Sequence, residues 1–158
     1  MALVAVNPVP KVCALLNGRH ARYLVVGGQA ALLHGLVRDT HDIDILIPED
    51  LENHARVIAA LSELEDHAAA ELTPRDFEEN VVVKIADEVE VDVSTRAWKV
   101  SYEDAISTAL RATVDGVEIP YLDIRTLIKS KETYRDQDQV DVAHLRVLLE
   151  RQDRAKGK

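Results

Sequence analysis

The residues best suited to chemistry are two aspartates in a strand-like run of isoleucines. Asp42 and Asp44 alternate with Ile43, Ile45 and Ile47, and strict alternation is typical of a β-strand with one buried face. The two carboxylates therefore share the opposite face, about 6.5 Å apart along the strand. At an effective dielectric constant of about 20 they repel each other by roughly 2–3 kcal/mol. Solvent, or a shared Mg²⁺ or Mn²⁺ ion, would relieve that repulsion.

A further carboxylate is available on a second strand of the same kind. Glu90 and Asp92 alternate with the valines of residues 89–93. If this strand lies beside the Asp42 strand, Asp92 completes a group of three carboxylates. Glu90 is the alternative third ligand, because the two acids share a strand face and a register shift would exchange them. Three carboxylates can hold two metal ions about 3.5–4 Å apart, the arrangement used for in-line phosphoryl transfer.

A pair of glycines precedes the Asp42 strand by fourteen residues. Gly27 and Gly28 end the apolar run 23–26 and precede a helical pattern over 29–36. Close approach of the backbone to a phosphate needs glycine, and a helix start offers free N–H groups. A simple tight turn between strand and helix is the alternative interpretation. One helix and one turn would bring the Asp42 strand back beside the first strand, so that glycines and carboxylates can meet.

The elements that position these groups alternate along the chain. Apolar periodicity predicts helices over 10–20, 29–36, 49–64, 102–111, 124–134 and 138–151, and strands over 23–26, 42–47, 81–85 and 88–93. Asp115-Gly116 predicts a two-residue hairpin turn. This mixture indicates an α/β (α+β) fold with a mixed central sheet and flanking helices. We expect a single domain over residues 1–158, with 151–158 as a disordered basic tail.

These motifs together resemble a known superfamily. Gly27-Gly28, Asp42-x-Asp44 and the later Asp92 are similar to the nucleotidyltransferase core of the DNA polymerase β type. The similarity to small bacterial nucleotidyltransferases of the abortive-infection toxin kind rests on segments 25–30 and 38–44, and it continues in the hairpin 114–117 and in segment 127–141. The resemblance spans roughly residues 20–150 and implies the nucleotidyltransferase fold.

The resemblance also implies an activity and a set of residue roles. The activity is Mg²⁺-dependent transfer of a nucleoside monophosphate from a nucleoside triphosphate (NTP) to a hydroxyl of a tRNA, protein or small-molecule acceptor. If ATP is the donor, the protein would be ATP-binding. Asp42, Asp44 and Asp92 would be catalytic and metal-binding, with Asp92 accepting the proton of the hydroxyl. The residues implied to contact the nucleotide are Gly27, Gly28, Gln29, Arg38, Thr40, Lys131 and Arg135, the last two one turn apart on a helix.

The resemblance extends to biology and also has one departure. Its subgroup implies a toxin–antitoxin or phage-defence role with a partner protein. Many members of the superfamily carry serine directly after the glycine, whereas Gly28 and Gln29 stand here. This departure motivates the alternative of an inactive nucleotide- or partner-binding module of the same fold. A metal-dependent hydrolase is a third possibility.

Composition and charge exclude several classes of protein. The chain has 158 residues, a net charge of −9 and one cysteine. The acidic balance disfavours general binding to a nucleic-acid backbone, and a single cysteine excludes a disulfide framework or a cysteine-rich zinc site. No membrane-length apolar run or signal peptide is evident, so we expect a cytoplasmic protein. Trp98, the one tryptophan, is interpreted either as hydrophobic cover or as part of a base pocket.

Overall fold

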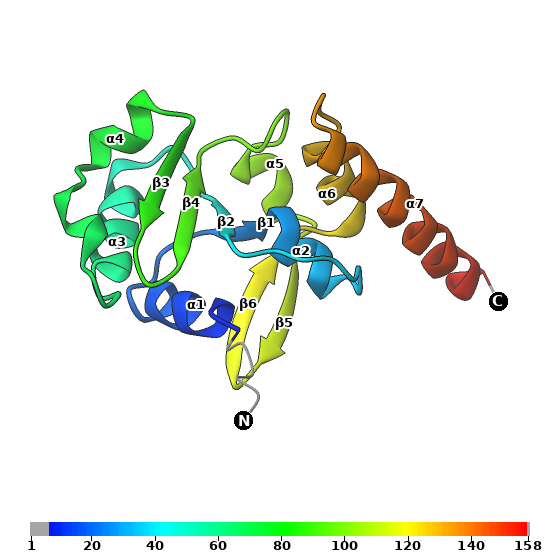
Figure 1. Ribbon diagram of the computed structural model, residues 1–158, viewed down its shortest axis with the longest axis horizontal. Coiled ribbons are helices and arrows are strands. Elements are labelled where there is room, and N and C mark those ends of the chain that lie inside the picture. Colours follow the sequence, from blue (N-terminus) through cyan, green and yellow to red (C-terminus); the bar gives the residue numbers. More distant parts are fainter. Residues whose placement is uncertain (1–6, 158) are drawn as a thin grey trace.

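A mixed sheet forms the centre of the molecule. The computed structural model describes residues 7–157, and within them six strands lie in the order β3-β4-β2-β1-β6-β5 (Figure 1). The pairs β2–β4 and β1–β6 are parallel, and the pairs β1–β2, β3–β4 and β5–β6 are antiparallel. The strands are β1 (Leu24–Val26), β2 (Ile43–Leu46), β3 (Val82–Ala86), β4 (Glu90–Ser94), β5 (Leu110–Val114) and β6 (Val117–Tyr121).

Helices flank this sheet, as expected for the α+β class. Helix α1 packs against α3 and β6, while α2 packs against β1, β2 and α6, and α7 follows α6 and extends away from the body of the molecule (Figure 1). None of the described helices is long and apolar enough to cross a lipid bilayer. The helices are α1 (Val9–Gly18), α2 (Gly27–Leu33), α3 (Leu51–Leu61), the 3₁₀ helix η1 (Ala68–Glu71), α4 (Pro74–Glu79), α5 (Tyr102–Ile106), α6 (Ile124–Ser130) and α7 (Asp136–Lys156).

Local sequence explains strand β2 and the turn between β5 and β6. Ile43 and Ile45 in β2 are fully buried, whereas Asp44 between them is only partly buried. The predicted alternation is therefore confirmed, and it sends the isoleucines into the core. The Asp115-Gly116 turn between β5 and β6 is confirmed too, because both residues have positive φ, 51° and 77°, as a type I′ hairpin turn requires.

Two helical predictions are wrong at their C-terminal ends, and two short helices were not predicted. The predicted helix over 102–111 stops at Ile106, and the segment from Leu110 pairs with β6 instead. The predicted helix over 124–134 stops at Ser130. The segment between α3 and β3, for which no element was predicted, contains η1 and α4. Strand pairing and helix packing, which depend on distant residues, override local periodicity at these places.

The C-terminal end of the chain also differs from the expectation. Residues 151–156, expected to be a disordered basic tail, continue helix α7 as far as Lys156. The sequence there is rich in good helix formers such as Arg, Gln and Ala. In addition, Arg125 of α6 donates to both carboxylate oxygens of Asp153, at 3.2 and 2.9 Å. That cross-helix ion pair holds the last turns of α7 in place.

Candidate functional site

The parallel pairing of β2 and β4 brings the acidic residues together. Asp44 and Asp92 are directly opposite each other in the register of the two strands. Asp42 immediately precedes β2, and Glu90 is the first residue of β4. Residues that alternate along each strand point to the same face. The conditional prediction that the Asp92 strand lies beside the Asp42 strand is therefore confirmed.

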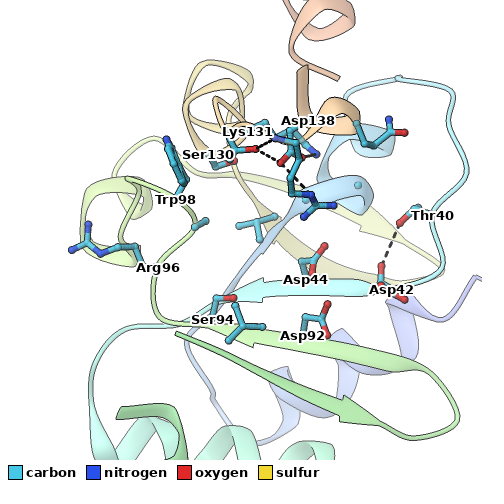
Figure 2. A pocket seen from close by; sticks show the side chains of 18 of the residues that line it. Thr40, Asp42, Asp44, Asp92, Ser94, Arg96, Trp98, Ser130, Lys131 and Asp138 are labelled. Atoms are coloured by element: carbon cyan, nitrogen blue, oxygen red, sulfur yellow. Dashed lines mark hydrogen bonds and ion pairs between the residues drawn. The ribbon is translucent and has the colours of Figure 1, made fainter. Parts of the chain in front are cut away.

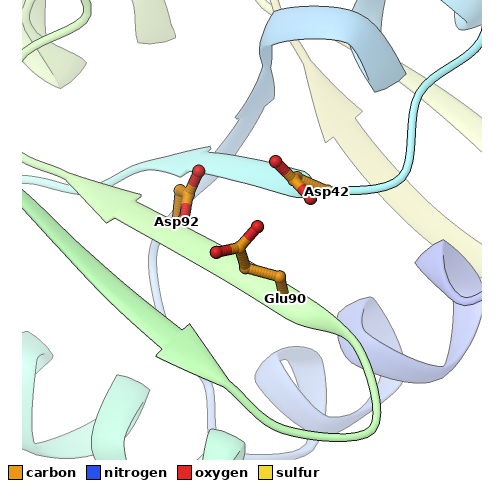
Figure 3. A group of neighbouring side chains, drawn as sticks. All are labelled: Asp42, Glu90 and Asp92. Carbon is orange, nitrogen blue, oxygen red and sulfur yellow. The ribbon is translucent and has the colours of Figure 1, made fainter.

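Three of these carboxyl groups form a compact acidic cluster. One oxygen each of Asp42, Glu90 and Asp92 lies within 4.8 Å of the others (Figure 3). Oδ1 of Asp92 is buried and has no hydrogen-bond partner among the described residues, and Lys84 Nζ lies 3.8 Å from its other oxygen. A buried, unpaired carboxylate oxygen is costly. A hard divalent cation at this cluster would satisfy it.

Asp44 lies in the same group and is electrostatically strained. Burial and the neighbouring carboxylates of Asp92 and Asp42 raise the pKa of Asp44 from 3.8 to about 7. Interaction with Asp42 and the charge of Asp92 also raise the pKa of Glu90. Raised carboxyl pKa values show that the cluster disfavours a full set of negative charges. A divalent cation would reverse that preference.

The raised pKa of Asp44 makes the stability of the metal-free protein depend on pH. The folded state binds the Asp44 proton more tightly than the unfolded chain, so this group's contribution falls as pH rises from about 4 to 7. We expect Asp44→Asn to melt higher than the wild type at pH 8 and the gap to shrink towards pH 5. Thermal unfolding of both proteins across this range measures the difference, and a pH-independent gap would contradict it. Mg²⁺ should narrow the gap at pH 8.

The glycine pair lies against the side chains of Asp44 and Thr40. Strand β1 passes straight into α2 at Gly27, whose φ is +65°. A Cβ atom built on Gly27 would lie 2.2 Å from Oδ2 of Asp44, and one on Gly28 would lie 2.8 Å from the hydroxyl of Thr40. The glycines thus let Asp44 and Thr40 approach the start of α2 closely. The two glycines therefore have a structural role, in addition to the phosphate binding expected of them.

Gly27→Ala is expected to disturb the acidic site as well as the fold. The new methyl group combines an unfavourable positive φ with a clash against Asp44, so we expect a loss of about 2–4 kcal/mol in unfolding free energy. Gly35→Ala is the matched control, because Gly35 has φ +94° but no atom within 4 Å of a built Cβ. Thermal unfolding and Mn²⁺ titration measure both variants. Equal losses would mean that backbone strain alone accounts for Gly27.

Two of the three basic residues expected to contact the nucleotide share a buried partner. Lys131 is 5% exposed, and its Nζ donates to Oδ2 of Asp141 at 2.7 Å, while Arg38 pairs with the same oxygen. Gln137 donates to the other oxygen at 3.0 Å. This network ties the loop before β2 to the start of α7.

Lys131 and Arg135 are not one turn apart on a single helix. Lys131 is the C-cap of α6, and Arg135 is the N-cap of α7. The helix breaks between them because Thr133 folds back, accepting from the Arg135 N–H at 3.1 Å and donating to Asp138 at 2.6 Å. Arg135 is exposed and lies 3.7 Å from Asp138. The break turns both side chains toward the same space despite the wrong helical prediction.

That space is a cavity of about 450 Å³ beside the acidic residues (Figure 2). This volume is in the range of small-molecule sites. Nine predicted site residues line it: Gly27, Gly28, Arg38, Thr40, Asp42, Asp44, Asp92, Lys131 and Arg135.

Gln29 is the predicted site residue that the cavity lacks. Its side chain is buried, and its amide donates to the backbone carbonyl of Asp42 at 3.4 Å. The position of Gln29 therefore does not support the expected contact with the nucleotide. The amide instead holds the backbone that presents Asp42, because the second helical residue after the glycine turns inward.

The cavity also contains residues that motif analysis missed. Ser94 continues the alternation of Glu90 and Asp92 along β4, and that periodicity could have identified it. Lys84 comes from strand β3, opposite Asp92, and the others come from loops and helix ends, where no periodicity exists. Trp98 had been left open between two interpretations. The additional lining residues include Lys84, Ser94, Arg96, Trp98, Ser130, Thr133, Gln137 and Asp138.

Comparison of the chain with models of protein families and with curated protein sequences gave no match.

Proposed function

We propose that this protein is a Mg²⁺-dependent nucleotidyltransferase that moves a nucleoside monophosphate from an NTP to an acceptor hydroxyl. The observation that carries the proposal is the cluster of carboxylates on two neighbouring parallel strands, facing one cavity that the glycine turn also lines. The buried, unpaired oxygen of Asp92 supports a divalent cation there. The sequence resemblance to polymerase β-type enzymes points to the same residues.

The charges around the cavity favour a polyanionic ligand. The whole chain carries a net charge of −9, yet several basic side chains line this cavity. A phosphate chain fits between metal-binding carboxylates and such cations, since each side neutralises part of its charge. The basic residues that line the cavity are Arg38, Lys84, Arg96, Lys131 and Arg135.

Each group has a role in the proposed reaction. Asp42, Asp44 and Asp92 would hold the metal, and bound Mg²⁺ would neutralise the charge that develops on the phosphates. Asp92 accepts the proton of the attacking hydroxyl. The hydroxyl oxygen then bonds to the α-phosphorus, the bond from that phosphorus to the bridging oxygen breaks, and pyrophosphate leaves. Gly27 and Gly28 place no side chain in the path of the phosphates.

A binding and turnover experiment tests the proposal. ATP, CTP, GTP and UTP are titrated calorimetrically with Mg²⁺, and pyrophosphate release is followed with tRNA, protein extract and small hydroxyl compounds as acceptors. We expect one or more triphosphates to bind only with Mg²⁺, and Asp42→Ala/Asp44→Ala to abolish binding. Asp115→Asn in the β5–β6 turn is the control, because it removes a charge outside the cavity. Absence of Mg²⁺-dependent binding would contradict the proposal.

One observation favours the alternative of a module that binds nucleotide without turnover. The charges of Lys131 and Arg38 are both already paired with Asp141, which leaves less positive charge free to stabilise a leaving group. Mg²⁺-dependent binding without pyrophosphate release would favour this alternative. Nucleotide hydrolysis without an adduct would instead indicate a metal-dependent hydrolase.

The resemblance to abortive-infection enzymes extends the proposal to a toxin–antitoxin or phage-defence role. In that case, transfer to an essential acceptor would arrest growth. Induced expression of the wild type and of Asp44→Asn in a bacterial host tests this role. Growth arrest that needs Asp44 would support it, and unimpaired growth of cells containing active wild-type enzyme would contradict it.

A further inference from the structure

Trp98 occupies an unusual turn at one end of the cavity. Ala97 and Val100 exchange two backbone hydrogen bonds, at 2.9 and 3.0 Å, so Trp98 and Lys99 form a two-residue turn in the loop between β4 and α5. Trp98 has φ +57°. A hairpin turn with positive φ at its first central position takes glycine by preference. Local backbone stability therefore does not explain a tryptophan here, and strained bulky residues are concentrated at functional sites.

The ring of Trp98 does little to cover the core. The residue is 39% exposed and lines the cavity, standing at its edge beside Arg96 and Ser130 (Figure 2). Tyr134, from the loop between α6 and α7, is 87% exposed and meets Trp98 edge to face, with ring centroids 5.7 Å apart. Two loops distant in sequence thus present paired, solvent-facing aromatic rings, and Trp98 of this pair lines the cavity. Exposed rings beside a phosphate-sized polar site are the usual means of stacking a base.

We propose that Trp98, buttressed by Tyr134, is the platform on which the base of the donor nucleotide stacks. The proposal rests on the proposed function, because it places the phosphates at Asp42 and Asp44 in the same cavity. Strand β4 and the loop that follows it connect the two ends, since Asp92 and Ser94 of the strand and Arg96 and Trp98 of the loop all line the cavity. Stacking depends on the π-face that every base has, so the platform holds the base with little choice among the four.

The fluorescence of the protein tests this directly, because Trp98 is its one tryptophan. The emission of the wild type with Mg²⁺ is followed during titration with each of the four NTPs and, separately, with inorganic triphosphate. We expect quenching by the NTPs, and binding of inorganic triphosphate, seen by calorimetry, without comparable quenching. Calorimetric binding of NTPs with unchanged Trp98 emission would overturn the platform and leave the proposed function standing. No binding of either ligand would overturn both.

Trp98→Gly separates stacking from folding. Glycine suits the backbone at this position, so we expect an unchanged or higher melting temperature, about tenfold weaker NTP binding and unchanged affinity for inorganic triphosphate. Trp98→Phe keeps a ring and should restore most NTP affinity. Equal weakening of NTP and inorganic triphosphate, or no weakening of either, would overturn the proposal. Tyr134→Ala should also weaken the binding of NTPs and not that of inorganic triphosphate, but by a smaller factor than Trp98→Gly.

Discussion

Replacing Asp92 by asparagine is expected to lower nucleotidyl transfer by about 10³-fold or more, while NTP binding changes by less than about tenfold. Asp92 faces Asp44 across β2 and β4 and has a buried oxygen without a partner. In the proposed reaction it receives the proton of the hydroxyl, a role that an amide cannot perform. Asp42 and Asp44 remain able to hold the nucleotide through the metal. Transfer rates under saturating NTP, together with calorimetric affinities, measure the two effects separately.

Glu90→Gln is the matched comparison for this prediction. Glu90 shares the strand face with Asp92 and contributes to the same acidic cluster, but it is more exposed and has no buried, unpaired oxygen among the atoms described. We expect it to retain transfer within about tenfold of the wild type. If Glu90→Gln abolishes transfer and Asp92→Asn does not, Glu90 is the third ligand and the proposed roles are exchanged. Equal, small effects of both would contradict a three-carboxylate mechanism.

Replacing Asp141 by leucine is expected to destabilise the fold by about 3–5 kcal/mol, because it leaves the buried Lys131 charge without a partner. Asp141 is 1% exposed and accepts from Lys131, Arg38 and Gln137. For a chain of this size the melting temperature should fall by about 10 °C or more. Differential scanning calorimetry measures the change. The loop before β2 should also lose its anchor, so NTP binding should weaken in the surviving folded protein.

An exposed ion pair between the same two helices provides the control. Asp153→Asn removes the solvent-exposed ion pair with Arg125. It should lower the free energy of unfolding by less than about 1 kcal/mol. Adding Lys131→Met to Asp141→Leu removes the unpaired charge and should recover part of the lost stability. A loss at Asp141 as small as that at Asp153, or a double variant no better than Asp141→Leu, would contradict the buried network.

Local pattern was enough to predict the parts that carry the proposed chemistry. The alternation of isoleucines with Asp42 and Asp44 placed both acids on one strand face, and the Asp115-Gly116 pair defined its hairpin turn. Both follow from side-chain periodicity and backbone preference within a few residues. The same local arguments were wrong at residues 107–111, where the chain from Leu110 pairs with β6, and at residues 151–156, where helix-forming residues continue α7 and an exposed ion pair with α6 assists them.

By itself, therefore, the sequence determined which residues share a strand face, where the glycine turn lies and which side chains are chemically capable. The tertiary structure alone decided that β2 and β4 are parallel neighbours with Asp44 opposite Asp92. It also decided that Gln29 turns away from the cavity, and that Trp98 meets Tyr134. These outcomes depend on contacts between segments far apart in the chain. Such contacts are selected by burial and register over the whole sheet, which a local pattern does not encode.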